Sequence, residues 1–401
     1  MWASGGGGAN AWELAMINAR VGFAEKLCFY SLVALGVVGL LSPFSYNYLP
    51  AGPIFEVVLV LAALIVFRLP KRSVIAFFIA AAAYVFGSFV VMNLYRPAHP
   101  LDFAQAYKAF FYVIPLCLFY KSDVFSRKFA VRVLKFLLVA FLIKYLYSII
   151  MNFTPRMGSR PGIYVENNFE LIFIILYFFV VRGDLGRRMT YWFLVLLAIV
   201  ALSGSRSSVL ALLVLFYGLY LNRLSLKTFF YFAGMLALGA VAAAIFFLRS
   251  EGGGVESIDR YNFMMVFVNE VSSWPSWKFL VGSMPLTPLS SSACGRLAFY
   301  DDLFSFAGDG RCYSVILHSY FLRVVFDHGI IGLAFLLWFM WCALRNSGYS
   351  KNDVAVFIGI VCSSALSVSA MNSVFVALAL ALALGLRKAP VLSSNRYTVS
   401  S

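Results

Sequence analysis

Long apolar runs recur along almost the whole chain, and they constrain its fold more than any other feature of the sequence. Nine runs fall within residues 27–248 and three within 329–386. Hydrophobic residues make up 62% of the chain and charged residues only 12%, whereas roughly 25% of a soluble domain is charged. A helix of about 20 apolar residues crosses a bilayer with its backbone polar groups satisfied internally. The sequence therefore predicts an all-α integral membrane protein with about twelve transmembrane helices.

Basic residues are unevenly distributed among the connections between these runs. If the amino terminus is cytoplasmic, the inner segments hold 20 of the 32 basic residues but only five of the 17 acidic ones. Cytoplasmic loops are enriched in Lys and Arg, so both termini are expected in the cytoplasm, with residues 1–26 as an amino-terminal segment and 387–401 as a tail. We assign the net charge of +15 to these loops and to anionic membrane lipids. Nucleic acid is not expected as a partner, because no basic soluble domain is present.

Residues 249–328 form the longest polar interruption and are expected to be one large periplasmic loop between helices nine and ten. Cys294 and Cys312 both lie in this loop, where an oxidising compartment favours a disulfide. The sequence alone leaves their pairing open, because the geometry of the two residues decides it. No Cys and His spacing is typical of a zinc site, so neither a metal nor another cofactor is expected.

Three short constellations carry polar residues on the outer face. They are Arg160–Asn168 before the sixth run, Ser203–Ser208 between the seventh and eighth, and His318–Gly332 where the large loop returns to the membrane.

Arg206 falls in the first turn of the eighth helix, directly after Ser203-Gly-Ser. Helix amides, serine hydroxyls and a guanidinium together form an anion site suited to phosphate. The alternative is an arginine that reaches the outer surface beside serines that only cap the helix. For Arg160, the alternative is a solvated loop charge.

His318 precedes a helix that carries Arg323 five residues later. An imidazole at the membrane surface can act as a general base, or it can simply bond to the backbone. Lys144 lies within the fifth run, and either reaches outward or faces a polar cavity.

Taken in order, these three constellations resemble the bacterial O-antigen polymerase/ligase superfamily. The shared features are an Arg-to-Asn motif before a span, a Gly-Ser-Arg-Ser turn opening a span, and a large outer loop ending in His-Ser-x-x-Leu and Gly-x-x-Gly. The long loop between helices nine and ten is similar too. The resemblance covers about residues 150–345 and implies a metal-independent glycosyltransferase of the inner membrane.

The resemblance also implies the substrate, which is a glycan carried on undecaprenyl diphosphate at the periplasmic face. Arg206 and Arg160 are then expected to bind the diphosphate, with Arg323 and Lys144 as further candidates. His318 is expected to orient or deprotonate the attacking sugar hydroxyl, with Glu166 as the alternative base. Besides membrane lipids, a chain-length regulator or a flippase is expected as a partner in lipopolysaccharide or exopolysaccharide biosynthesis.

A polymerase is favoured over an O-antigen ligase. Many ligases resemble one another in an Asn-Pro-Asn-like tract, where this chain has Glu166-Asn-Asn168. A transporter or flippase remains an alternative class, although transporters usually contain internal repeats and none is visible here. A membrane partner without catalytic activity is the last alternative.

Overall fold

A computed structural model describes residues 11–42, 47–67, 70–150, 161–165, 167–220, 234 and 259–387 of the protein. Helices are the only regular elements of these ranges, apart from a single bridge between Phe125 and Leu386. The prediction of an all-α fold is therefore confirmed.

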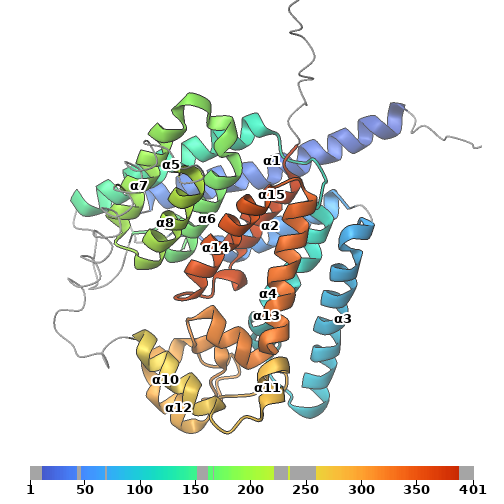
Figure 1. The fold of residues 1–401 in the computed structure, drawn as a ribbon, viewed down its shortest axis with the longest axis vertical. Helices are drawn as coiled ribbons and strands as arrows, with labels where there is room; N and C mark the ends of the chain where they lie inside the picture. The colour runs from blue at the N-terminus through green and yellow to red at the C-terminus, as the bar shows by residue number, and fades with distance from the viewer. Residues whose placement is uncertain are drawn as a thin grey trace, which may run out of the picture.

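The α-helices are shown in Figure 1, which colours the chain from its amino terminus to its carboxyl terminus. Their bounds are α1 Ala11–Leu41, α2 Ala51–Ile65, α3 Arg72–Tyr95, α4 Pro100–Phe119, α5 Arg127–Ile150, α6 Asn167–Val181, α7 Met189–Ser203, α8 Arg206–Tyr220, α10 Asp259–Val271, α11 Ser276–Val281, α12 Ser291–Arg296, α13 Tyr320–Asn346, α14 Lys351–Ala365 and α15 Val374–Gly385. Short 3₁₀ helices cover Arg182–Arg188, Ala298–Leu303, Ser314–Ile316 and Ala370–Asn372.

Three helical segments of the described residues are long and apolar enough to cross a membrane. They are Asn18–Leu41 within α1, the whole of α3 and the whole of α13. Among the shorter apolar helices are α2, α8 and α15. These segments support a membrane protein, because about 20 apolar residues span the hydrocarbon layer.

The short helix α15 forms the centre of the bundle. Every residue from Val374 to Gly385 is buried, and the helix packs against α2, α4 and α6. A helix that is apolar on all sides is stable only when other helices or lipid surround it. The leucines and alanines that alternate along this segment therefore predict burial, but not the neighbours that provide it.

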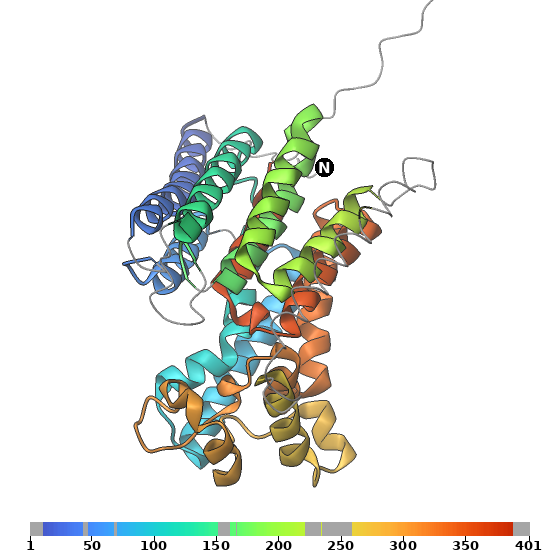
Figure 2. The ribbon, with the colours of Figure 1, turned by 90° about the vertical axis from the view of Figure 1, so that its left-hand side faces the viewer.

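Helices α10, α11 and α12 gather at the lower end of the molecule in both ribbon views (Figures 1 and 2). We call this the loop end. Side chains of this region form a second hydrophobic core, separate from that of the bundle, and Phe263, Leu297 and Ile316 are among its buried members. The described part of the large polar loop, from residue 259 onwards, thus has a hydrophobic interior of its own.

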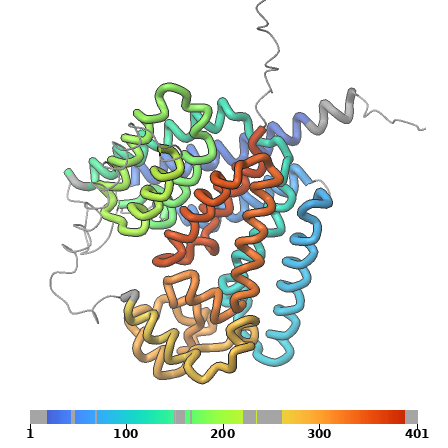
Figure 3. Tube along the Cα trace, in the orientation of Figure 1, coloured from blue at the N-terminus to red at the C-terminus, as the bar shows by residue number. Residues whose placement is uncertain are grey.

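Two boundaries differ from those expected from the sequence. α1 begins at Ala11, inside the segment expected to precede the first membrane helix, because no proline interrupts residues 11–41. α13 begins at Tyr320, inside the expected loop, and Gly329 interrupts its helical backbone at φ 67°. The Cα trace follows α13 from the loop end towards the opposite end, alongside α3 (Figure 3).

Candidate functional site

The Ser203–Ser208 turn is held against the first turn of α6. Gly204 ends α7 in the left-handed conformation, at φ 57°, which glycine adopts without steric cost. The Ser205 hydroxyl then donates to the Asn168 side-chain oxygen at 2.7 Å, and the Ser207 hydroxyl reaches the same oxygen at 3.4 Å. Two of the three constellations, far apart in sequence, therefore meet at the start of α6.

Glu170, also in the first turn of α6, fixes the residues that precede this helix. Its carboxylate is fully buried and accepts backbone N–H bonds from Ile163 and Tyr164, both at 2.8 Å, and from Val165 at 3.4 Å. Tyr145 also donates its hydroxyl, at 3.3 Å. One carboxyl group thus accepts the N–H groups of three successive residues and holds their backbone in place. Glu170 is not among the residues proposed from the sequence, although an acid in an otherwise apolar helix is a signal for such a role.

Lys144 lies in the protein interior beside α6. Its side chain is buried in α5, its ammonium donates to the Ser42 carbonyl at 2.6 Å, and it lies close enough to Glu170 to interact electrostatically. The structure thus places the Lys144 ammonium in the protein interior, against the carbonyl that follows the end of α1.

The segment held by Glu170 forms one wall of an open hollow of about 410 Å³. Tyr164 and Val165 line it on one side, and Asn47 and the range Leu49–Pro53 at the start of α2 line it on the other. The volume falls within the range of about 300–1,000 Å³ that is usual for small-molecule sites. The described side chains that line the hollow are uncharged.

The packing of α8 on α14 sets the position of Arg206. Gly359 of α14 packs closely against Val214 of α8, and Gly218 of α8 against Val356 of α14, so the two helices run in opposite directions. Arg206 precedes Val214 by eight residues, and Ser367, just beyond the end of α14, follows Gly359 by eight residues. Both steps lead towards the loop end. Equal numbers of residues span nearly equal lengths, so Arg206 lies level with the connection 366–373, which joins α14 to α15.

His318 borders the same connection. The hydroxyl of its neighbour Ser319 donates to the Ala365 carbonyl at 3.5 Å, where α14 ends. The half-buried imidazole lies edge-on to the rings of Phe263 and Tyr300, with centroids 5.1 and 5.2 Å away. The core of the large loop therefore orients this ring, and the end of α14 lies between the third constellation and the second.

Arg323 is buried and holds the connection 366–373 in place. Its guanidinium donates to the Gln105 carbonyl of α4 and reaches the Ser369 hydroxyl at 3.5 Å. Asn372 donates to the same carbonyl at 3.2 Å and accepts the Ala109 N–H at 3.1 Å. In a regular helix these two backbone groups bond to each other. Asn372, which carries no signal in the sequence, thus joins an irregular segment to α4.

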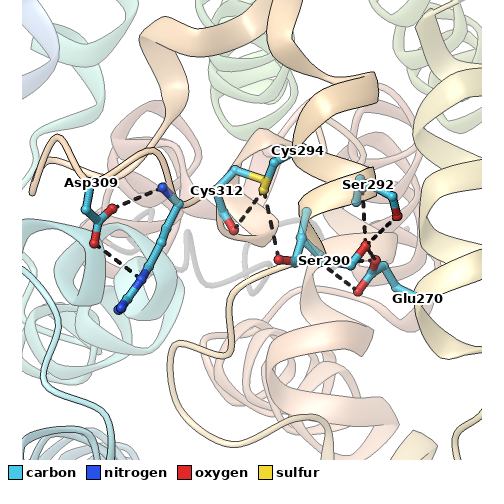
Figure 4. The surroundings of a disulfide bond; sticks show 9 residues. Glu270, Ser290, Ser292, Cys294, Asp309 and Cys312 are labelled. Atoms are coloured by element: carbon cyan, nitrogen blue, oxygen red, sulfur yellow. Dashed lines mark hydrogen bonds and ion pairs between the residues drawn. A yellow bond between two sulfur atoms is a disulfide. The ribbon is translucent and has the colours of Figure 1, made fainter.

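A disulfide closes the part of the large loop that precedes His318 (Figure 4). Cys294 and Cys312, whose pairing the sequence leaves open, are bonded with their Cα atoms 5.7 Å apart. Nearby, the Ser290 hydroxyl caps α12 by accepting the Ala293 N–H at 3.2 Å, and the same hydroxyl bonds to Glu270. The disulfide therefore links α12 covalently to the segment that leads into His318.

A second tether joins the large loop to α4. The buried Asp102 accepts the Ser305 hydroxyl at 2.7 Å and the Phe306 N–H at 3.2 Å. Burial raises the pKa of the Tyr313 phenol above its usual value, and the negative charge of Asp102 raises it further. Tyr313 is therefore neutral near pH 7 and does not serve as an anion.

Two residues proposed from the sequence, Arg160 and Glu166, lie outside the residues that the structure describes. Of the others, Arg206 and His318 border one connection, and Lys144 lies beside the first turn of α6. The described residues bring a hydroxyl-rich helix start and an imidazole to the connection 366–373, and a buried ammonium to the first turn of α6. Such a set can hold an anionic leaving group while a hydroxyl is deprotonated.

No family model, no curated protein and no solved structure matches the chain.

Proposed function

We propose that the protein is an integral-membrane glycosyltransferase of the O-antigen polymerase type. It transfers a glycan from undecaprenyl diphosphate onto another lipid-linked repeat unit at the periplasmic face of the bacterial inner membrane, and both of its termini are cytoplasmic. The observation that carries the proposal is the hydrogen bond between Ser205 and Asn168, because it joins the Arg206 turn to the first constellation.

The leaving group of this reaction is a lipid diphosphate. Negative charge develops on it as the glycosidic bond breaks, and fixed cations nearby lower the free energy of the transition state. Arg206 supplies such a cation beside three serine hydroxyls at the start of α8, with Arg160 as its expected partner. A guanidinium suits this role because it binds phosphate oxygens with two N–H groups at once.

The attacking group is a sugar hydroxyl, which must lose a proton. His318 is the proposed base, since its imidazole is fixed by two aromatic rings and borders the same connection as Arg206. Glu166 is the second candidate for this step.

An O-antigen ligase, which moves the glycan to lipid A–core, is the second candidate function. The acid at Glu166 favours the polymerase over it. A flippase or other transporter is the third candidate.

The experiment that tests the proposal uses a strain that lacks the gene and is complemented with variants. Arg206→Ala and His318→Ala are expected to abolish chain extension while the protein is still inserted and expressed. Surface polysaccharide on a gel should then show a single repeat unit on the core. Arg206→Lys is expected to restore extension poorly, because lysine cannot make the paired contact.

Arg296→Ala and His99→Ala are matched controls, since Arg296 is exposed and His99 caps α4. Both should keep the full ladder of bands. Bare core in the deletion strain would favour the ligase, and lipid-linked units trapped inside the cell would favour a flippase. A normal ladder from both Arg206→Ala and His318→Ala would refute the enzyme proposal.

A further inference from the structure

A cavity of about 290 Å³ lies between α3, α4, α11 and α13. Its apolar walls include Ala80 of α3, Phe110 of α4, Val281 of α11, and Ile331 and Phe335 of α13. Among the residues that the structure describes, no acid, lysine or arginine lines it. The volume is about that of ten water molecules in the liquid, so a segment of a flexible chain fits.

The polar groups of the cavity wall are already satisfied. Tyr84 and His328 line the cavity, and the Tyr84 hydroxyl bonds to His328 Nδ1 at 2.8 Å. The other ring nitrogen, Nε2, lies 3.1 Å from the Ala106 carbonyl. A sugar or a phosphate placed here would lose hydrogen bonds to water without replacing them, and this is costly. The chemistry of the cavity therefore favours a hydrocarbon occupant.

The cavity also lies at the depth of the lipid chains. Tyr84 is twelve residues from Arg72, the first residue of α3, which corresponds to about 18 Å of helix. Ile331 is fourteen residues from Arg345, near the end of α13, or about 21 Å. Because the hydrocarbon layer is about 30 Å thick, both measures place the cavity inside it.

The cavity opens between two helices that can each cross the membrane. α3 and α13 touch towards the opposite end of the bundle, where Phe77 packs on Phe339 with ring centroids 5.5 Å apart. Towards the loop end, α11 lies beside α13 (Figure 1). At the mouth, the side chains of Val281 and Ile331 are 51% and 58% exposed, so in a bilayer they face lipid.

Close packing of α11 on α13 fixes the position of α11 at this opening. The backbone N–H of Ser283 donates to the Phe326 carbonyl at 2.7 Å, and a Cβ at Gly282 would lie 2.7 Å from the Gly329 nitrogen. The backbones of the two segments therefore meet where α13 is interrupted. The interruption lets α11 form the cavity wall on the loop side.

We propose that this cavity is a lateral binding site for the hydrocarbon chain of a membrane lipid, which enters between α3 and α13. The site is defined without reference to glycan transfer, so it stands or falls separately from the proposed function. An acyl chain and a polyprenyl chain share the required chemistry, and the two arms of the experiment distinguish them.

The full-length protein is reconstituted into vesicles that contain phosphatidylethanolamine with a photoreactive diazirine in its acyl chain. A parallel sample contains a diazirine-bearing polyprenyl phosphate. After irradiation, labelled residues are mapped by mass spectrometry. Labelling is expected at Phe335 and Ile331 in excess of that at Phe86, which is 71% exposed on α3. Labelling by either lipid supports the site, and labelling by only one identifies the chain that it prefers.

Ala80→Phe fills the cavity from α3 without disturbing the core, since Ala80 is exposed. It should lower labelling of Phe335 about tenfold, a change of about 1.4 kcal/mol in binding free energy. The matched control is Ala83→Phe, at an exposed alanine of the same helix outside the cavity, which should leave labelling unchanged. Ile331→Trp fills the cavity from α13 as a second variant. The inference is overturned if Phe335 is labelled no more than Phe86, or if both filling variants label like the control.

Discussion

Replacing Cys294 and Cys312 together by alanine should loosen the large loop while leaving the helix bundle intact. The two cysteines are 18 residues apart in sequence and lie in the second hydrophobic core. The bridge therefore restricts only the part of the chain that surrounds α12 and leads into His318. Alanine is chosen because both side chains are buried, and a serine hydroxyl there would need a hydrogen-bond partner.

The stability that the disulfide adds to this unit follows from the number of residues in the loop that it closes. Crosslinking residues 18 apart removes about 3 kcal/mol of chain entropy from the unfolded loop at 25 °C. Without the bridge, the equilibrium constant for local opening of this unit should rise on the order of 100-fold. Helices of the bundle share no such crosslink, so the expected change is confined to residues 259–319.

Hydrogen exchange followed by mass spectrometry, on the protein in detergent, measures this opening directly. Peptides from residues 259–319 should exchange much faster in the double variant, and peptides from α6 and α15 at their original rates. Cys362→Ala is the control, because it removes a thiol of α14 that takes no part in the bridge. Exchange of residues 259–319 that stays within about twofold of the native rate would refute the entropic reasoning. Intact protein from cells should also resist thiol alkylation at both positions, as expected for the periplasmic side.

Two further substitutions test the packing on which the candidate site depends. Glu170→Gln should lower the free energy of unfolding by about 2–3 kcal/mol, because an amide cannot accept all the backbone N–H bonds of a buried carboxylate. Thermal unfolding in detergent measures the loss of stability. The control is Glu270→Gln, whose bonds to Ser290 are solvent-exposed, and it should lower the free energy of unfolding by less. Equal losses in the two variants would contradict the role of burial. Gly329→Ala should destabilise by at least about 2 kcal/mol, since its φ is 67° and a Cβ would collide with the Leu280 carbonyl. Gly87→Ala, in open space on α3, should instead stabilise by about 0.5–1 kcal/mol, so a loss of melting temperature in both variants would contradict the reasoning.

Burial of the helices could be predicted from the sequence, because it depends on the residues themselves. The alternating leucines and alanines of α15 are apolar on every side, so this segment had to lie inside protein or lipid. The polarity of residues 249–328 likewise predicted a segment outside the hydrocarbon layer, but not that Val281 of α11 would line a cavity beside α3 and α13. The sequence predicts the ends of helices less well, as at Ala11 and Tyr320, since residues at a helix end are compatible with both helix and loop.

Local chemistry also identified some groups of the candidate site. The Ser203–Ser208 turn carries its own signal, because glycine permits the left-handed turn that ends α7 and serines favour helix starts. His318 and Arg160 were also singled out from their own chemistry; the resemblance to a family assigned their roles, which remain proposals.

The meeting of these groups was decided only by the tertiary structure. The bond from Ser205 to Asn168, the carboxylate of Glu170 against residues 163–165, and the contact of Ser319 with Ala365 each join segments that the sequence does not relate. Asn372 is the clearest case, since its side-chain amide forms hydrogen bonds with a backbone carbonyl and a backbone N–H of α4 that would otherwise bond to each other. The physical reason is that hydrophobicity and helix propensity act along the chain and determine which segments are helical and buried. Hydrogen bonds between segments depend on the relative placement of whole helices, and that placement is set by the packing of all their side chains at once.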